Sequence, residues 1–336
     1  MSRKPIRVGI VGVGRVGRDV ARILAARQPA FTLVGGCSRD PAHLGQDLGV
    51  LSGGPAVGAP VSGSLSALLD QRPEVTLIAT TSFLAEVAAD IRDCVAAGSN
   101  VLVTAEEAAY PWAVDEALAD ELGQLARERG VTILGGGVNP GLIFDALVLT
   151  AAGACPEVAG IAVERHVTFA RFSANVLSRL GVGYSADEFA TGVREQRVFG
   201  HLGFPQSMRV VAGALGRRID RIDRHIEPIF ADAETSAENL TVPAGHTAGV
   251  EQHYIAVSEG RPWYDARLIG HIDPGSAGLG ARDVIRISGA QDVNLVVDPG
   301  FDPQVSSAAV LANSIERLVE ASPGWKTVAE LPPAHP

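Results

Sequence analysis

A glycine-rich turn near the start of the chain constrains the fold more than any other feature. The apolar run "IRVGIVGV" at residues 6–13 is typical of a strand buried on both faces, and residues 15–28 follow it with helical spacing. Between them, Gly12, Gly14 and Gly17 match the pattern G-x-G-x-x-G. In this strand-turn-helix context the pattern predicts a βαβ unit that binds a dinucleotide. The alternative is a plain glycine turn.

Each glycine has a distinct role in such a unit. Gly12 is expected to allow the tight turn, Gly14 to let the backbone approach a pyrophosphate, and Gly17 to let the helix pack on the strand. The helix N-terminus then faces the phosphate charge. We predict that Arg15 and Val16, which lie inside the motif, also line the cofactor site.

The first part of the chain alternates between strand and helix patterns. Helical patterns cover residues 83–98 and a stretch from Pro111, a favoured first-turn residue, to about residue 129. The strand patterns fall at 31–37, 75–80, 100–104 and 131–136. Such alternation predicts an α/β fold, in which a parallel sheet with right-handed crossovers forms an N-terminal Rossmann dinucleotide-binding domain over residues 1–138.

The pattern changes after about residue 139. A helix is expected at 141–154 and two more near 185–196 and 205–216, among long alternating strands. We therefore expect an α+β C-terminal domain at 139–303 with a broad mixed or antiparallel sheet, used for substrate binding and dimerisation. The helical segment near the end should bring residues 304–336 back to the first domain. A broad sheet needs its second face buried, so a homodimer is expected.

Composition excludes several classes of partner. The formal net charge of -10 argues against binding to nucleic acid or to an anionic membrane surface. No apolar run approaches the roughly 20 residues that span a bilayer. Cys37, Cys94 and Cys155 form no close pair and show no metal-ligand spacing. We expect a cytoplasmic protein without a bound metal.

The end of the second strand bears on which nicotinamide cofactor is used. An acidic residue that binds the 2′-hydroxyl of NAD is expected there, but the sequence reads "GGCSRDP". Ser38 and Arg39 stand at the position instead, and a hydroxyl with a guanidinium suits a 2′-phosphate. NADP(H) is therefore the preferred cofactor, with NAD(H) possible. In the alternative, Arg39 is a solvated turn residue and Asp40 takes the acid role.

Three later strand ends carry polar residues, and open sheets bind ligands at the carboxyl ends of their strands. Thr80, Thr81 and Ser82 are small and able to contact ribose or phosphate. Asn139, after a run of glycines, either holds the nicotinamide carboxamide or caps the next helix. Glu106 and Glu107 follow the strand at 100–104, where a carboxylate is either a base or a counter-charge for a cation. Surface charges near a helix N-terminus are the alternative.

Several longer motifs resemble one family nearly end to end. They are "GVGRVG", "SRDPAHLGQDLG", "TAEEAAYPW", "GGGVNPGLIFD", "GHLGFPQSM" and "LANSIERLVEASPGWKTVAELP". The chain resembles the 2,4-diaminopentanoate dehydrogenases and the related native amine dehydrogenases, within the wider dihydrodipicolinate reductase-like group. The resemblance implies a two-domain homodimer that binds NAD(P)H. It also implies reductive amination of a ketone by ammonia, and the reverse oxidative deamination.

The resemblance also implies site residues. It assigns catalysis to Glu106 and makes Glu107 the less favoured candidate. We otherwise predict that Glu107 binds the substrate. Asn139 and Pro140 are implied at the nicotinamide and substrate, and His201 at the pocket edge; Asn313, in the last motif, is predicted to bind the cofactor. The remaining predicted substrate-binding residues are Phe144, Thr168, Phe169, Phe172, Leu177 and Phe199. For each phenylalanine, core packing is the alternative.

The chain departs from the diaminopentanoate pattern at several positions. Gln206-Ser207 stands where those enzymes tend to have Glu-Ser, Leu177 where Gln would fall, and Thr168-Phe169 in a stretch that is more polar there. Fewer polar anchors make a worse site for a zwitterionic diamino acid, because unpaired buried charges are expensive. We therefore expect a small, mostly apolar ketone or aldehyde as the substrate.

Other functions stay open at this point. One alternative is reduction of another C=N bond, as in dihydrodipicolinate reductase, or the 2,4-diaminopentanoate dehydrogenase reaction itself. Tyr110 and His201 leave room for an oxidoreductase that acts on an alcohol. A protein that senses NADPH without turning it over is a different class. Oxidation of NADPH with a panel of ketones, with and without ammonium, separates these functions.

Overall fold

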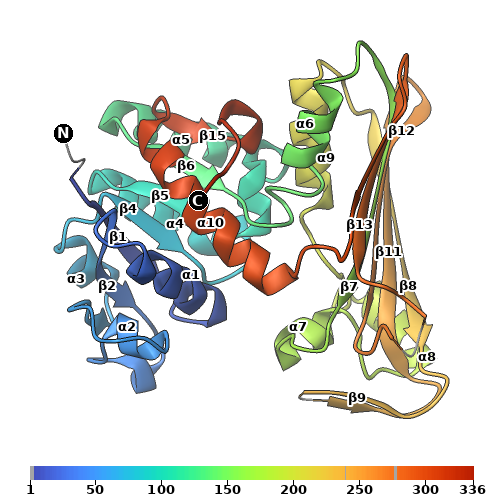
Figure 1. Ribbon diagram of the computed structural model, residues 1–336, viewed down its shortest axis with the longest axis horizontal. Coiled ribbons are helices and arrows are strands. Elements are labelled where there is room, and N and C mark those ends of the chain that lie inside the picture. The colour runs from blue at the N-terminus through green and yellow to red at the C-terminus, as the bar shows by residue number, and fades with distance from the viewer. Residues whose placement is uncertain (1–3, 239, 276–277) are drawn as a thin grey trace. The chain divides into compact units, whose positions relative to one another are not determined.

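The chain folds into two compact units, each built around its own sheet (Figure 1). The computed structural model describes residues 4–238, 240–275 and 278–336. Unit 1 takes the chain up to Ala146 together with Gln304–Pro336, and unit 2 takes Leu147–Pro303. The glycine fingerprint and the glutamate pair therefore lie in unit 1, and His201 lies in unit 2.

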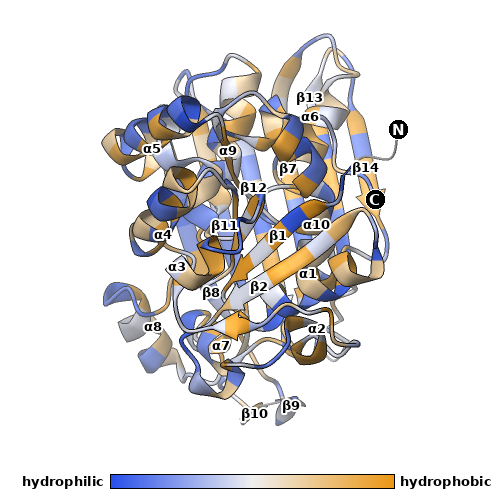
Figure 2. Ribbon diagram, turned by 90° about the vertical axis from the view of Figure 1, so that its left-hand side faces the viewer, coloured by the Kyte–Doolittle hydropathy of each residue, from blue (hydrophilic) through white to orange (hydrophobic). Residues whose placement is uncertain are grey.

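Unit 1 contains a parallel sheet whose strand order, over the described residues, is β15-β6-β5-β4-β1-β2-β3. Its interior strands are short apolar runs, as expected for strands covered on both faces. Figure 2 shows β1 and β2 mostly in the colours of hydrophobic residues. The strands are β1 (Ile6–Val11), β2 (Phe31–Cys37), β3 (Val61–Ser62), β4 (Val75–Ile78), β5 (Asn100–Val103), β6 (Thr132–Gly135) and β15 (Gly324–Lys326). The parallel sheet confirms the Rossmann-type prediction.

Amphipathic helices cover this sheet. Leu24 of α1 and Ile315 of α10 belong to the same buried cluster as Ile10 of β1, so the last long helix of the chain is part of the core of unit 1. No helix of the described ranges is long and apolar enough to cross a membrane. The helices are α1 (Arg15–Ala26), α2 (Leu48–Leu51), α3 (Leu65–Leu69), α4 (Leu84–Ala96), α5 (Glu116–Arg129) and α10 (Pro303–Glu320), with 3-10 turns η1 (Pro41–His43), η2 (Glu106–Ala109), η3 (Pro111–Ala113) and η4 (Val328–Glu330).

Two helix starts predicted from the sequence are wrong. Pro111 opens only a 3-10 turn, and α5 begins at Glu116 because the Asp115 side chain accepts the backbone N–H of Leu118 and caps the helix there. The helix expected from residue 141 begins at Ala146 as α6 (Ala146–Ala152). Gly141 has φ +127°, which is incompatible with a right-handed helix.

Unit 2 contains a mixed sheet, which the described residues form in the order β14-β13-β7-β12-β11-β8. The pair β7–β12 is parallel, and the other pairs are antiparallel. The strands are β7 (Val158–Thr168), β8 (Arg221–Phe230), β11 (Thr247–Ser258), β12 (Arg261–His271), β13 (Arg282–Gly289) and β14 (Val293–Val297). A small hairpin pairs β9 (Thr235–Ala237) with β10 (Leu240–Val242), and the helices are α7 (Ala174–Arg179), α8 (Ala186–Arg194) and α9 (Phe204–Ala214).

The sheet of unit 2 confirms the prediction of a broad mixed sheet. Strand β8 was not predicted, because "RIDRHIEPIF" is rich in charge and lacks a buried face at the edge of the sheet. One face of the sheet packs on a helix: the ring of Tyr254 stacks on Phe204 of α9 with centroids 4.8 Å apart. In Figure 1, α6, α7 and α9 lie on one side of this sheet.

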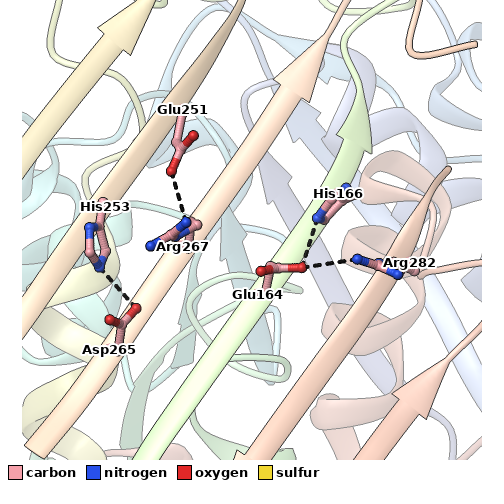
Figure 3. A network of polar contacts seen from close by, with 7 residues as sticks. All are labelled: Glu164, His166, Glu251, His253, Asp265, Arg267 and Arg282. Carbon is pink, nitrogen blue, oxygen red and sulfur yellow. Dashed lines mark hydrogen bonds and ion pairs between the residues drawn. The ribbon is translucent and has the colours of Figure 1, made fainter. Parts of the chain in front are cut away.

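The opposite face carries a ladder of ion pairs across neighbouring strands (Figure 3). We call this set, Glu164, His166, Glu251, His253, Asp265, Arg267 and Arg282, the charged face. Arg267 lies 3.2 Å from Glu251, and His253 lies 2.9 Å from Asp265. Glu164 contacts both His166, at 2.9 Å, and Arg282, at 3.3 Å. Two of these contacts, Arg267–Glu251 and Arg282–Glu164, pair opposite charges across adjacent strands, which stabilises the sheet register.

Candidate active site

The carboxyl ends of four strands of unit 1 meet at one edge of the sheet. Strand β1 pairs with β2 on one side and with β4 on the other, so the strand order reverses at β1. Ligands of open α/β sheets bind beside such a switch point. Gly12 follows β1, Thr80 follows β4, Glu106 follows β5 and Asn139 follows β6.

The glycine loop has the geometry that a dinucleotide cradle requires. Gly12 has φ +91°, and a Cβ there would lie 2.4 Å from the carbonyl oxygen of Ala79. A Cβ on Gly17 would lie 2.2 Å from the carbonyl oxygen of Gly12, so only glycine lets α1 pack on β1. Gly14 is exposed at the N-terminus of α1, and a Cβ there meets no heavy atom of the described residues within 4 Å. The first N–H groups of α1 are thus open to an anion.

The side chains around this loop differ in what holds them. Thr80 lies against the loop, since its Cγ2 would be 2.9 Å from a Cβ on Gly12. Arg15 donates a hydrogen bond of 2.9 Å to Gln304 at the start of α10. Val16 is half-buried and packs against the apolar core of unit 1.

The residues after β2 form a small polar cluster. Ser38 is buried; its Oγ lies 3.0 Å from Nδ1 of His43 and accepts the backbone N–H of Asp40. Asp40 in turn accepts the N–H of Ala42 and caps η1. Arg39 is exposed, and its positive charge interacts electrostatically with the Asp90 carboxyl. Burial raises the pKa of the Asp90 carboxyl, while Arg39 opposes that rise. A cation is therefore available beside the expected ribose position.

The two adjacent glutamates of η2 are held in different ways. Glu107 accepts the N–H of Leu84 at 2.7 Å, and Leu84 is the first residue of α4. Its carboxylate therefore caps that helix. Glu106 is half-buried, and its Oε1 accepts a hydrogen bond of 3.1 Å from Oγ of Ser82. The carbonyl of Ser82 also accepts the N–H of Glu107, so the segment after β4 orients both glutamates.

The position of η2 itself depends on Gly135 at the end of β6. A Cβ on Gly135 would lie 2.2 Å from the carbonyl carbon of Ala108. The missing side chain lets η2 lie directly over the strand end. Trp325 of β15 donates its indole N–H to the carbonyl of Ala108 at 3.1 Å and fixes the turn from the other side. The backbone that carries Glu106 is thus held tightly.

Asn139 and Pro140 lie in a turn closed by a buried carboxylate. Asp145 accepts the N–H groups of Gly141 and Ala146, and Asp145 is 0% exposed. Asn139 does not take the helix-cap role, because α6 begins at Ala146. Its Oδ1 is buried and accepts no hydrogen bond within the part of the chain described here. Buried polar atoms are usually paired, so this oxygen fits a ligand that carries an amide N–H, such as a nicotinamide carboxamide.

Asn313 is not part of this edge. Its Oδ1 accepts a hydrogen bond of 2.7 Å from Arg27, the residue that follows the last turn of α1. The glycine loop lies at the other end of that helix, roughly 18 Å away at 1.5 Å per residue. The structure therefore shows Asn313 joining α10 to the end of α1, and its contact with the cofactor stays a prediction. The residue of α10 near the loop is Gln304, which accepts from Arg15.

The predicted substrate-binding residues outside η2 are mostly deep in the fold. Phe144 is fully buried within unit 1, and in unit 2 the buried ring of Phe169 packs on Phe172 with centroids 5.1 Å apart. Leu177 of α7 is also buried. Thr168 bonds locally, since its Oγ1 accepts the N–H of Ala170. The burial of Phe144 and Phe169 agrees with core packing, and their contact with substrate stays a prediction.

Phe199 and His201 lie together in the loop before α9. The guanidinium of Arg179 lies 5.6 Å from the centroid of Phe199, and the ring of His201 meets Phe204 edge-on at 5.5 Å. Gln206 and Ser207 of α9, the departures noted in the sequence, are both buried.

Three residues shape these segments, and two of them, Asp145 and Gln252, were not predicted as site residues. Ser82 orients Glu106, Asp145 closes the Asn139 turn, and Gln252 of β11 holds the loop of His201. Two of them carried a recognisable pattern. Asp145 ends the apolar run "GLIF", and Gln252 is the polar member of the inward-facing series Val250, Gln252, Tyr254. A polar side chain at an inward position predicts a buried hydrogen-bond network.

These features together define a class of protein. A glycine cradle at the switch point of a Rossmann sheet, an unpaired carboxamide oxygen and an oriented carboxylate are the parts of a nicotinamide-dependent oxidoreductase. The described residues contain no cluster of histidine, cysteine and acidic side chains that could hold a metal ion.

Comparison with known proteins gives the family. Residues 142–336 match the family model "2,4-diaminopentanoate dehydrogenase C-terminal domain", and residues 6–104 match "Dihydrodipicolinate reductase, N-terminus". The chain is 30% identical to the 2,4-diaminopentanoate dehydrogenase of Acetoanaerobium sticklandii over 335 residues, which cover 97% of this chain and 93% of that protein. The chain belongs to the 2,4-diaminopentanoate dehydrogenase family, with a dihydrodipicolinate reductase-like first domain, and is an NAD(P)-dependent oxidoreductase.

Solved structures agree on the fold. The amine dehydrogenase of Mycobacterium smegmatis superposes with a TM-score of 0.87 at 24% identity, covering 98% of this chain and 97% of that one. The dipicolinate-bound dihydrodipicolinate reductase of Paenisporosarcina sp. TG-14 gives a TM-score of 0.52 at 16% identity, covering 96% of this chain and 97% of that one.

Proposed function

We propose that this protein is an NAD(P)H-dependent amine dehydrogenase that aminates a small, mostly apolar ketone or aldehyde with ammonia and catalyses the reverse oxidative deamination. The observation that carries the proposal is the division of roles in η2. Glu107 is committed to the N–H of Leu84, whereas Ser82 orients Glu106 at the carboxyl edge of the sheet. The names of a 30% identical relative and of a structural neighbour support amine chemistry.

Glu106 has two tasks in this reaction. Ammonia is mostly ammonium at neutral pH, and the Glu106 carboxylate attracts that cation and accepts its proton, which leaves a nucleophile for the carbonyl carbon. Once water has left, the same negative charge stabilises the positively charged iminium. A bound nicotinamide supplies or removes the hydride at that carbon. Ser82 takes no part in the proton transfer in either task; its hydroxyl donates to Oε1 of Glu106 and keeps that oxygen in one orientation.

Substrate choice follows from the lining of the predicted pocket. The residues assigned to it are mainly apolar, and the position that follows "GHLGFP" is a neutral, buried Gln206 rather than a glutamate. A charged amino-acid substrate would need paired charges in such surroundings. We therefore place the substrate among apolar ketones and aldehydes, unlike the diamino acid in the relative's name.

Mutation of each glutamate tests the division of roles. Glu106→Gln should lower the rate of amination by about 10²–10⁴-fold while NADPH binding, followed by fluorescence, survives. Glu107→Gln is the matched control: it weakens the cap of α4 by about 1 kcal/mol but keeps most of the turnover. Equal turnover by Glu106→Gln and the unmodified protein would remove Glu106 from the mechanism.

The reaction class is tested by oxidation of NADPH with a panel of ketones and aldehydes. Turnover that requires ammonium supports amination. Turnover of cyclic imines without ammonium points to a C=N reductase, turnover of ketones without ammonium points to an alcohol-forming enzyme, and tight NADPH binding with no turnover points to a sensor. Each of these three results rejects the amine dehydrogenase proposal.

For the cofactor we propose a preference for NADP(H). Ser38 and Arg39 supply a hydroxyl and a cation after β2, and Asp40, the competing acid, already caps η1. Arg39→Ala should raise the Kd for NADPH by about 10-fold or more and leave the Kd for NADH within about 2-fold, since an ionic hydrogen bond contributes ~1.5–3 kcal/mol. A similar loss for both cofactors would contradict a role at the 2′-phosphate.

We also propose that the protein is a homodimer that buries the charged face of unit 2 against a second copy. Ile269 lies on that face, since it pairs in register with Glu251 and His166. Ile269→Asp should convert the dimer to a monomer in light scattering. Val50→Asp, at an exposed position of unit 1, is the control and should leave the mass unchanged. A monomeric unmodified protein would reject this proposal.

A further inference from the structure

The loop that carries Phe199 and His201 has an unusual backbone. Gly200 lies at φ +67°, a conformation that glycine adopts without strain. The N–H groups of Phe199 and Gly200 both donate to the carbonyl of Arg179, and Arg224 donates to the carbonyl of Phe199 at 2.7 Å. These bonds tie the loop to α7 and β8, but they leave the backbone of His201 itself to be held by another group.

That group is the side chain of Gln252, which is fully buried on β11. Its Oε1 accepts the N–H of His201 at 2.8 Å, and its Nε2 donates to the carbonyl of His201 at 2.8 Å. The same Nε2 lies 3.3 Å from the carbonyl of Phe199 and 3.3 Å from the hydroxyl of Tyr254. One amide therefore satisfies both backbone groups of His201.

Aromatic contacts close a ring around this clamp. The imidazole of His201 meets Phe204 edge-on at 5.5 Å, and Phe204 stacks on Tyr254 at 4.8 Å. Tyr254 is in turn within hydrogen-bond distance of Gln252. The backbone of His201 and the stack beneath its ring are thus both tied to the same amide.

No other side chain can replace the amide. A glutamate has the same shape, but its second oxygen would face the carbonyl oxygens of Phe199 and His201 without a proton to donate. A leucine would leave buried N–H and C=O groups unpaired, which is costly. The amide also leaves no space for a side chain at position 200, because a Cβ on Gly200 would lie 2.5 Å from Oε1 of Gln252.

We infer that Gln252 is a positioning residue that fixes the orientation of His201 at the edge of the substrate pocket. This inference rests on the proposed function for the place of His201, but the hold of Gln252 on the loop does not depend on that function. A small misplacement of a pocket group costs up to ~10²-fold in rate. Loss of the clamp should therefore act on the ketone step while the cofactor cradle, in unit 1, is unaffected.

The test combines kinetics with a double-mutant cycle. Gln252→Leu should lower kcat/KM for the ketone by about 10–100-fold, whereas the Kd for NADPH stays within about 2-fold. If Gln252 acts through His201, His201→Ala and the double variant should have the same activity, so that the two effects do not add. Gln124→Leu, at an exposed glutamine of α5, is the matched control and should behave as the unmodified protein. Additive losses would overturn the inference.

A spectroscopic measurement separates this inference from the proposed function. In protein labelled with ¹³C-histidine, the ring resonance of His201 should move in Gln252→Leu, because the ring leaves the edge of Phe204. Tyr254→Phe keeps the aromatic stack and removes one hydrogen bond. It should move the His201 resonance in the same direction and lower kcat/KM by about 3–10-fold. If Gln252→Leu does not fold, Tyr254→Phe decides the question. Unchanged resonances and rates would overturn the inference. An unmodified protein that aminates no ketone would reject the proposed function, while the resonance would still test the clamp.

Discussion

Gly14 provides the sharpest test of the cofactor cradle, because it separates binding from folding. A methyl group at this position meets no heavy atom of the described residues within 4 Å, and its backbone is extended at φ -77°. Gly14→Ala should therefore change the free energy of unfolding by less than ~0.5 kcal/mol, as a gain in unfolded-state entropy offsets a poorer helix N-cap. The new methyl group instead occupies the space through which a pyrophosphate approaches the N–H groups of α1.

The expected loss of affinity follows from the contact removed. A hydrogen bond from a backbone N–H to a charged phosphate contributes ~1.5–3 kcal/mol, which corresponds to about a 10–100-fold rise in the Kd for NADPH. Gly17→Ala should behave in the opposite way: its Cβ would lie 2.2 Å from the carbonyl oxygen of Gly12 and should cost ~1–3 kcal/mol of stability or more.

The assay pairs calorimetric titration of NADPH with chemical unfolding of the same samples. Gly213→Ala is a control in unit 2, since Gly213 is exposed near the end of α9 and a Cβ there meets no described atom within 4 Å. It should keep the affinity for NADPH and gain up to ~1 kcal/mol of stability. An unchanged Kd in Gly14→Ala, at full stability, would refute the assignment of this loop to the pyrophosphate.

Three further predictions concern groups that hold the fold around the site. Asp283→Ala should lower the free energy of unfolding by ~3–5 kcal/mol in urea, because Arg165, 3.4 Å away and equally buried, loses its counter-charge; a loss below 1 kcal/mol would contradict this. Asp47 is partly desolvated, which would raise its pKa, but four backbone N–H groups hold that pKa below its ordinary value. The Asp47 carboxylate thus stabilises the fold above pH ~4, and this stabilisation is lost as the pH falls through the lowered pKa of the folded state. Asp47→Asn should therefore be less stable than the unmodified protein at pH 6. Its free energy of unfolding should also fall less steeply as the pH is lowered. Gly135→Ala should displace η2, since its Cβ would lie 2.2 Å from the carbonyl carbon of Ala108. The variant should lower turnover by ~10²-fold, with a smaller effect on the Kd for NADPH. Normal turnover would show that η2 does not position Glu106.

Local patterns were enough to predict the first sheet and the strand ends that meet at its carboxyl edge. The strand before Gly12, the glycine spacing and the helix after it are contiguous in sequence, and a parallel sheet brings every strand end to one edge. Thr80, Glu106 and Asn139 could therefore be placed at that edge by counting strands. Backbone conformations set by short-range sterics need no knowledge of distant residues.

The division of labour between Glu106 and Glu107 was beyond the sequence. The two residues are adjacent and chemically identical, and what separates them is the N–H of Leu84 and the hydroxyl of Ser82, which lie more than twenty positions earlier. The partner of Asn313 was beyond the sequence for the same reason, because Arg27 lies 286 positions earlier in the chain.

The sequence by itself determined the βαβ cradle, the mixed second sheet and the identity of the chemical groups. Tertiary structure decided which carboxylate caps a helix, where α5 and α6 begin, and how Gln252 holds His201. The physical reason is that propensity and periodicity act over a few neighbouring residues. The partner of a buried polar group is instead chosen by whichever donor or acceptor the folded chain brings within about 3 Å, and that choice depends on the whole fold.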